Sequence, residues 1–305
     1  MKRKINRVGQ TTLTVSLPSK WVRQNNIKKG DEIDVEEEGT KLILAPNLHP
    51  IKKEAIITIP NPESYLERFI CGPYVKGYDK IIVKYKDKEI YNRVLKTSKL
   101  LMGFEIIDEG EGYCTLANIS SQLEENFGVL MNRLFMDSIS FGKEFVEKLK
   151  SSEKEDLDIL LEYEFNANRI ALFCRRIIQK GGIDHKVYST FSLYSVIAHV
   201  EESIDLFREI IRMLGDSRPK LDKSTLELFE KAVKMQNIQY EIFANLVKGK
   251  TVMDLIDLFR QHKDLRRSVW HNLDYFKGDK INSYICGKLI AMVELSHHIS
   301  EELFY

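Results

Sequence analysis

Hydrophobic and polar positions alternate with several different periods inside the first 46 residues. From Thr11 to Leu17, apolar side chains alternate with Thr and Ser, which predicts a strand with one buried face. Pro18 interrupts that pattern and suits the first turn of a helix, and the apolar residues after it predict a short one. Alternation around Ile33 and the run from Leu42 to Leu44 predict two more strands, separated by a glycine turn. Because a unit of this size buries little apolar surface, we expect two copies to share strands in a dimer.

Mixed periodicity from residue 51 to about residue 116 predicts a small α/β region. The expected elements are strands at 55–59 and 80–85, helices at 62–74 and 90–102, and a hairpin across 104–116. This region contains no phosphate-binding glycine loop and no nucleophile elbow. We therefore predict a connecting or dimerisation role for it.

The chain from Asn118 onward shows helical spacing of its apolar residues. Six helices are predicted, at 119–150, 153–180, 188–214, 222–248, 251–276 and 279–304. Short connections between six helices favour two three-helix bundles. The predicted fold is therefore α+β and multidomain. Its parts are a small β domain at 1–48, an α/β region at 49–117, and an all-α domain at 118–305 with repeats at 118–214 and 220–305.

Charge is distributed unevenly along the chain. The whole chain has a net charge of +1, yet residues 1–30 contain eight Lys and Arg and no acidic residue. Residues 31–305 therefore carry −7, the difference between +1 and +8. A basic edge on an acidic remainder is typical of nucleic-acid binding, because attraction to phosphate needs only clustered cations. The alternative is a solvated basic surface without a partner.

Composition disfavours several classes of protein. No stretch approaches the roughly 18 consecutive apolar residues that a membrane-spanning helix needs. The first residues lead into a polar strand instead of an apolar signal segment, so we expect a cytoplasmic protein without membrane insertion. The four cysteines are far apart and lack zinc-finger spacing, which indicates ordinary thiols. No catalytic set follows from the spacing of Ser, Cys, His and Asp, and we expect no enzyme.

The N-terminal residues carry a series of recognisable features. These are Arg7, Gly9, a strand ending at Pro18, Trp21 and Val22 in the helix, the turn Lys29-Gly30-Asp31 and the final strand LILAP. In them the unit resembles the AbrB/SpoVT/MazE family of swapped-hairpin DNA-binding domains. In that family two chains interlock into one small β-barrel, and basic side chains near the first strand contact DNA. With the longer stretch from Gln10 to Leu17 and the sequence SLPSKWV, the unit resembles the form found in archaeal phosphate uptake regulators, which carry a PhoU-like domain.

The resemblance implies a set of DNA-binding residues and two kinds of partner. Carried onto this chain, the DNA contacts fall to Lys4, Arg7, Lys20 and Arg23. The implied partners are double-stranded DNA and a second copy of the chain, joined through the N-terminal domain. The implied fold of that domain is a swapped-hairpin β-barrel.

Apolar stripes and polar flanks recur in three of the predicted helices. At about 100° per residue, the second and third helices have core stripes that include Ile170, Cys174, Ile197, Ile204 and Phe207. Beside its stripe each helix places a glutamate and, four residues later, a second polar side chain. The three frames are Glu164 with Asn168, Glu201 with Asp205, and Glu294 with His298.

Each frame has two interpretations. Residues four apart share a helix face, so each pair can hold one cation, with Mg²⁺ suited to the oxygens and iron, zinc or manganese suited to an added histidine. Alternatively the flanks are ordinary ion pairs, such as Asp205 with Arg208 three residues later. Arg175 and Arg176 present a similar choice between an anion site and surface salt bridges.

The helical half is similar to PhoU, a phosphate-uptake regulator built from two three-helix repeats with E(D)xxxD motifs that bind metal clusters. Only Glu201 to Asp205 keeps the full motif here. The two resemblances together predict a DNA-binding transcriptional regulator of phosphate uptake. The alternative is an adaptor that contacts a phosphate transporter or sensor kinase and binds no DNA. A third interpretation, the antidote of a toxin pair, fits the N-terminal unit but not the long helical part.

Overall fold

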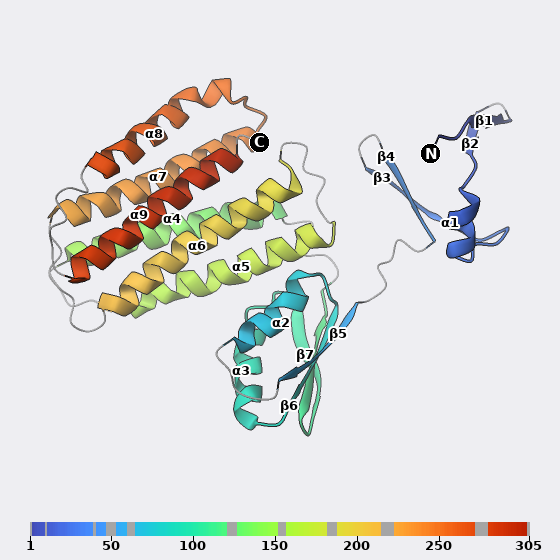
Figure 1. Cartoon of the computed structure of the whole chain (residues 1–305), viewed down its shortest axis with the longest axis horizontal. Coiled ribbons are helices and arrows are strands. Elements are labelled where there is room, and N and C mark those ends of the chain that lie inside the picture. The colour runs from blue at the N-terminus through green and yellow to red at the C-terminus, as the bar shows by residue number, and fades with distance from the viewer. Residues whose placement is uncertain are drawn as a thin grey trace. The chain divides into compact units, whose positions relative to one another are not determined.

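The computed structural model describes most of the chain and divides it into two compact units. The described residues are 2–9, 11–38, 41–46, 53–59, 65–120, 127–151, 157–181, 188–214, 223–271 and 280–303. Residues contact one another mainly within an N-terminal unit that ends at Lys52 and within a larger unit that runs from Lys53 to Tyr305. Figure 1 labels helices and strands of both units. The described helices include none that is long and apolar enough to cross a membrane.

Two hairpins and one short helix make up the described part of the N-terminal unit. Its elements are β1 (Ile5–Val8), β2 (Thr12–Val15), α1 (Ser19–Gln24), β3 (Asp34–Glu38) and β4 (Lys41–Ala45). β1 pairs antiparallel with β2, and β3 pairs antiparallel with β4. The predicted elements β2 to β4 are confirmed, whereas β1 is an addition, because its sequence INRV shows no alternation of apolar and polar residues. An interlocked barrel requires a second chain and stays a prediction.

A four-stranded mixed sheet begins the larger unit. Its strands are β5 (Glu54–Ile59), β6 (Lys80–Tyr85), β7 (Phe104–Gly110) and β8 (Tyr113–Asn118), in the order β5-β6-β8-β7. β5 and β6 are parallel, while β8 is antiparallel to both of its neighbours. The helices α2 (Leu66–Val75) and α3 (Lys88–Ser98) lie on one face of the sheet (Figure 1). The strands and the hairpin predicted here are confirmed, and the predicted start of α2 at residue 62 lies outside the described residues.

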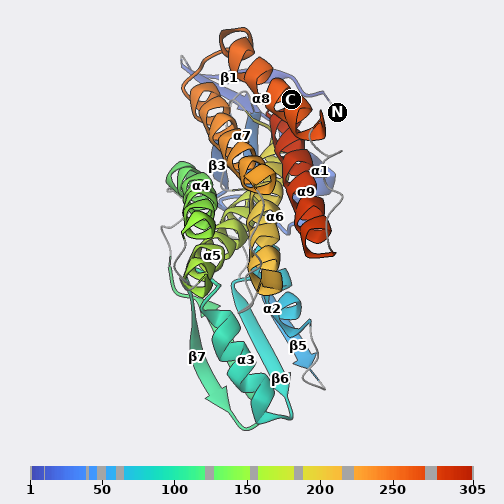
Figure 2. The same ribbon diagram turned by 90° about the vertical axis from the view of Figure 1, so that its left-hand side faces the viewer.

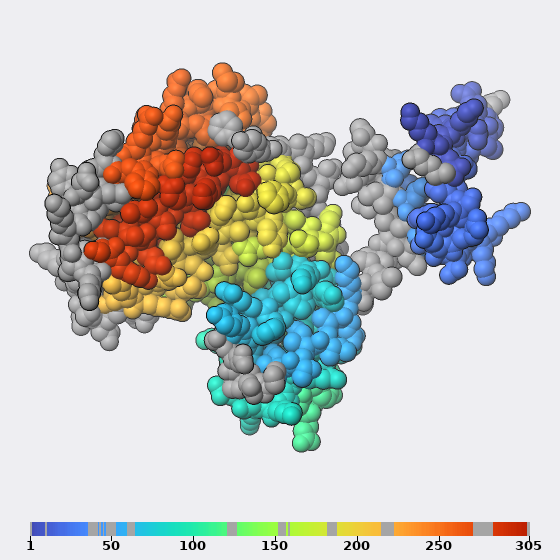
Figure 3. Space-filling view, in the orientation of Figure 1, coloured from blue at the N-terminus to red at the C-terminus, as the bar shows by residue number. Residues whose placement is uncertain are grey.

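In the described part of the chain six long helices follow the sheet, as the spacing of apolar residues predicts. They are α4 (Phe127–Lys150), α5 (Leu161–Gln179), α6 (Thr190–Leu214), α7 (Lys223–Val247), α8 (Ile256–His271) and α9 (Lys280–Glu302). Helices α4, α5 and α6 contact one another, and so do α7, α8 and α9. Contacts of α6 with α9 and of α4 with α7 join the two groups, and Figure 3 shows α6 (yellow) beside α9 (red) on the surface. The closer likeness to PhoU stays a prediction.

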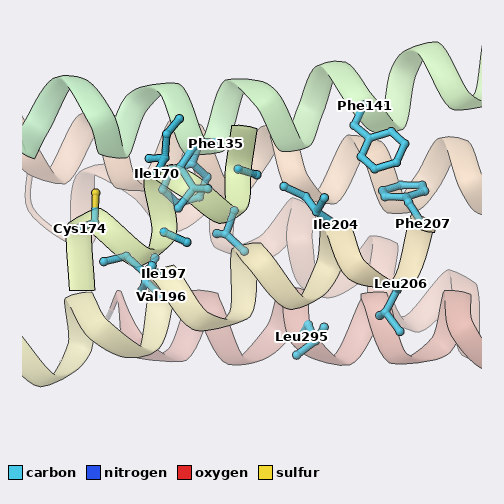
Figure 4. Close-up of a cluster of buried hydrophobic side chains, with 14 of the residues drawn as sticks. Phe135, Phe141, Ile170, Cys174, Val196, Ile197, Ile204, Leu206, Phe207 and Leu295 are labelled. Carbon is cyan, nitrogen blue, oxygen red and sulfur yellow. The ribbon is translucent and has the colours of Figure 1, made fainter. Parts of the chain in front are cut away.

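The core of the helices is built from the apolar stripes that the sequence predicts. Ile170, Cys174, Ile197, Ile204 and Phe207 are all buried. Figure 4 shows residues of α4, α5 and α6 meeting there, with the rings of Phe141 and Phe207 side by side and their centroids 5.2 Å apart. Interdigitation of this kind fixes the rotation of each helix, and with it the direction of the polar flanks.

A buried arginine joins the sheet region to the helices. α2 packs between α3 and α5 (Figures 1 and 2), and Arg176 of α5 reaches into this contact. Its guanidinium donates to the carbonyls of Tyr74 and Tyr78 at 2.8 and 2.6 Å and to Asp79 Oδ1 at 2.8 Å. Of the two interpretations of Arg176, the salt bridge is present, but its expected place on the surface is wrong, because the side chain is only 3% exposed. The predicted boundary at residue 118 marks the change from sheet to helices. The sheet and the helices nevertheless belong to one compact unit.

Candidate nucleic-acid interface

The four basic residues predicted to contact DNA are exposed and lie on separate segments of the N-terminal unit. Lys4 immediately precedes β1, Arg7 lies within β1, and Lys20 and Arg23 lie on α1. Residues three apart on a helix share a face, so the structure brings Lys20 and Arg23 together on one side of α1. α1 begins after Pro18, which occupies the N-cap with extended backbone angles, and Arg23 in its last turn interacts favourably with the helix dipole.

Arg7 lies on the apolar face of the first hairpin. It is paired in register with Leu13, and Ile5 is paired with Val15. Because side chains two residues apart in a strand share a face, Arg7 lies on the same face as these three apolar residues. A turn at Gly9, with φ of +76°, closes the hairpin next to Arg7. The guanidinium is thus placed at the turn end of an otherwise apolar face.

The apolar side chains of both hairpins are open to solvent within the single chain. Ile5 is 68% exposed, Leu13 62% and Val15 51%, and on the second hairpin Val35 is 58% and Leu42 64% exposed. Among the N-terminal residues whose burial is described, none is buried. A two-stranded hairpin is at best marginally stable alone in water. These strands therefore need a covering surface, which agrees with the dimer expected from the size of the unit.

Opposite charges occupy different segments of the same unit. Acidic residues begin only after the turn at Gly30, where the backbone N–H of Lys28 donates to Asp31 Oδ2 at 2.7 Å. Between residues 31 and 38 there are six acidic residues and no basic one. The basic residues without acidic neighbours are therefore those between residues 2 and 29, where attraction to phosphate is strongest.

Residues 7–54 match the family model of antidote-toxin recognition MazE, bacterial antitoxin. The match begins within β1, covers β2 to β4 and ends at the first residue of β5. It supports the AbrB/MazE-like character expected of the N-terminal unit. Searches of curated proteins and of solved structures found no match to the chain.

The residues predicted as metal ligands make ion pairs and hydrogen bonds in the larger unit. Arg208 Nη1 of α6 lies 2.7 Å from Glu164 Oε1 of α5 and 2.8 Å from Asp205 Oδ1. Asn168 Nδ2 donates to the same Glu164 oxygen at 2.7 Å. The pairing of Asp205 with Arg208 suggested by their spacing is confirmed. Glu164 and Asp205 are brought together, with Arg208 between them.

The other two frames are paired in the same manner. Arg175 of α5 forms an ion pair with Glu201 of α6. Arg266 of α8 donates to both oxygens of Glu294 of α9, at 2.7 and 3.2 Å, and Trp270 Nε1 donates to one of them at 3.2 Å. Each of these glutamates therefore has an arginine from the adjacent helix as its partner. Sequence spacing could not find these partners, because they come from distant segments.

His298, the remaining predicted ligand, lies beside two other histidine rings. Its side chain is exposed, and its ring centroid lies 5.5 Å from that of His199 and 6.2 Å from that of His297. Among the residues that the structure describes, no group of three or more His, Cys, Asp or Glu side chains is arranged to hold a metal ion. Metal binding at the frames stays a prediction.

The electrostatics differ between the frame at Asp205 and the frame at Glu294. Burial raises the pKa of Asp205 to about 6, and neighbouring carboxylates add to this effect, while Arg208 opposes it. Burial also acts to raise the pKa of Glu294. There the hydrogen bonds and charge of Arg266 outweigh burial, so the pKa of Glu294 lies below its usual value. Asp205 therefore titrates near neutrality, whereas Glu294 stays ionised.

A buried polar network near α8 was not apparent from the sequence. His262 is 4% exposed, and its Nε2 lies 2.9 Å from Ser296 Oγ of α9. Gln239 of α7 donates to the same hydroxyl and to the carbonyl of Ser296. Burial, aided by the charges of His297 and Arg266, lowers the pKa of His262 to about 4. The imidazole is therefore neutral at physiological pH and ties α8 to α9.

Proposed function

We propose that the protein is a non-enzymatic regulator that binds duplex DNA through a homodimeric N-terminal unit. The observation that carries this proposal is the set of exposed basic side chains, Lys4, Arg7, Lys20 and Arg23, in the unit that matches the MazE family model. Lys and Arg side chains of this kind neutralise DNA phosphates and release counterions, whatever the base sequence. The absence of acidic residues before Asp31 leaves this attraction unopposed on these segments.

A second copy of the chain completes the proposed DNA-binding unit. The exposed face of Ile5, Leu13 and Val15 needs cover, and a shared barrel of two chains supplies it. In such a dimer Arg7 lies at the turn end of the covered face and stays accessible to a phosphate. Dimerisation also doubles the number of basic contacts.

The salt dependence of DNA binding tests the proposal. If all four basic residues of both copies neutralise phosphates, the slope of log affinity against log salt is about −7, at about −0.9 per phosphate. Arg7→Ala combined with Lys20→Ala removes half of these contacts, so we expect a slope of about −4 on random-sequence duplex DNA. The matched control is Lys263→Ala with Arg267→Ala, which removes the same charge from exposed positions of α8.

Two results would count against DNA binding. One is the absence of binding by the wild-type chain at low salt. The other is an equal change of slope in both double variants, which would indicate a response to net charge alone. An adaptor that contacts a phosphate transporter or sensor kinase would then be the better proposal.

A toxin antidote is a second candidate, favoured by the description of the matched family. In this alternative the N-terminal unit belongs to a protein that binds and neutralises a toxin. The long helical unit favours the regulator, since antidotes of this family usually end in a short disordered tail. Phosphate uptake as the regulated process rests only on the resemblance of the helical residues to PhoU. If deletion of the helical unit leaves DNA affinity unchanged, coupling between that unit and DNA binding is absent.

A further inference from the structure

We propose that arginine side chains take the place of metal ions at the three carboxylate frames of the helical unit. The arginines are Arg208, Arg175 and Arg266, which pair with Glu164, Glu201 and Glu294. Each pair crosses between adjacent helices, α5 with α6 in two cases and α8 with α9 in the third. This inference concerns the helical unit alone and is independent of the proposed DNA binding.

The frame around Arg208 shows the substitution most clearly. A single guanidinium nitrogen lies within 2.8 Å of oxygens from Glu164 and Asp205, on two different helices. The three side chains are 20%, 17% and 34% exposed, so solvent screens their charges only in part. Carboxylates facing each other at such a place repel, and a cation between them favours their ionised forms. Arg208 supplies it as a group that is always protonated.

One oxygen of Glu164 is already taken by two nitrogen donors, where a metal ion would need it as a ligand. Mg²⁺ or Ca²⁺ needs about six oxygen ligands at roughly 2.0–2.6 Å. The same Glu164 oxygen already accepts hydrogen bonds from Arg208 and from the amide of Asn168, both at 2.7 Å. Both of these donors are nitrogens that carry hydrogen and cannot coordinate a metal. A metal ion would have to displace the guanidinium to bind this oxygen of Glu164.

The other two frames follow the same rule with different neighbours. Arg175 pairs with Glu201 and lies over the ring of Tyr194, 5.6 Å from its centroid. Arg266 binds Glu294 through two nitrogens, and Trp270 adds a third hydrogen bond. A planar guanidinium suits such bidentate and stacked contacts. All three ion pairs therefore join neighbouring helices through protein side chains alone.

Removal of Arg208 provides the test, because it leaves oxygens without a cation. In Arg208→Ala the carboxylates of Glu164 and Asp205 remain, together with the amide oxygen of Asn168. We expect this variant of the full chain to melt at a lower temperature in EDTA and to recover several degrees in millimolar Mn²⁺. The wild-type chain and the control Arg212→Ala, an exposed arginine one turn further along α6, should melt alike in EDTA and Mn²⁺. The melting is followed by far-UV circular dichroism.

A further variant assigns the regained ion to these carboxylates. Adding Glu164→Gln and Asp205→Asn to Arg208→Ala should abolish the response to Mn²⁺. Mn²⁺ binding is also measured by equilibrium dialysis. On the wild-type chain this measurement does not depend on whether any variant folds. Wild-type binding of Mn²⁺ that is lost in the Glu164→Gln, Asp205→Asn double variant would overturn the proposal. So would an Arg208→Ala variant that folds but neither loses stability in EDTA nor binds Mn²⁺. None of these measurements involves DNA, so their failure leaves the proposed function untouched.

Discussion

Removing Arg176 should weaken the contact between the sheet region and the helices. Its guanidinium is 3% exposed and donates to two backbone carbonyls and to Asp79, which is itself 11% exposed. The rings of Tyr74 and Phe104 lie against it, with centroids 5.1 and 4.9 Å away. Arg176→Met keeps most of the volume and the apolar contact but removes every donor. Asp79 and the two carbonyls are then left in a buried place with too few partners.

The size of this effect follows from the partners that remain. Loss of one member of a buried ion pair costs about 3–5 kcal/mol. Lys180 Nζ, 3.4 Å from the same Asp79 oxygen, keeps part of the compensation, so we expect a loss of about 3 kcal/mol. Replacing both partners, as in Arg176→Met with Asp79→Leu, removes the stranded charge and should restore stability to within about 1–2 kcal/mol of the wild type.

Urea unfolding followed by far-UV circular dichroism measures these differences, because the helices dominate the signal. Arg212→Met, at an exposed position of α6, is the matched control and should change the free energy of unfolding by less than about 0.5 kcal/mol. The reasoning fails if Arg176→Met loses no more than this control. It also fails if the double variant is less stable than Arg176→Met, since no stranded charge would then explain the loss.

Three more substitutions test the helical unit. Because the pKa of His262 is lowered in the folded state, the unfolded state binds a proton more readily as the pH falls. The free energy of unfolding is therefore unaffected by His262 above about pH 6.5 and falls by about 3 kcal/mol towards pH 4. His262→Gln should flatten this pH dependence in urea unfolding, and an unchanged dependence would refute it. A Cβ at Gly142 would lie 2.7 Å from Val233 Cγ2, so Gly142→Ala should cost about 1–2 kcal/mol by overpacking. Gly287→Ala, where nothing lies within 4 Å, should instead gain up to about 1 kcal/mol of helix propensity; equal melting temperatures would contradict both expectations.

Much of the secondary structure could be predicted because it is encoded by neighbouring residues. The helical spacing that begins near Asn118 predicts all six helices, and the buried stripes of α5 and α6 are those expected at about 100° per residue. β1 escaped prediction because INRV has no alternation of its own and gains its strand character from pairing with β2. The exposed basic residues of the N-terminal unit were likewise predictable, since a charge excess is a property of sequence alone.

The tertiary structure alone determined which charges meet. Glu164 and Arg208 are 44 positions apart, and Asp79 and Arg176 are 97 apart. Sequence spacing placed Glu164 and Asp205 on helix flanks but could not show that an arginine of the next helix would lie between them. The partner of a flank depends on how two helices rotate and slide against each other, which is fixed by the packing of their buried stripes. The sequence by itself thus determined the elements and the basic N-terminal segment, and only the packing decided that Arg208 holds Glu164 and Asp205 and that Arg176 is buried beneath α2.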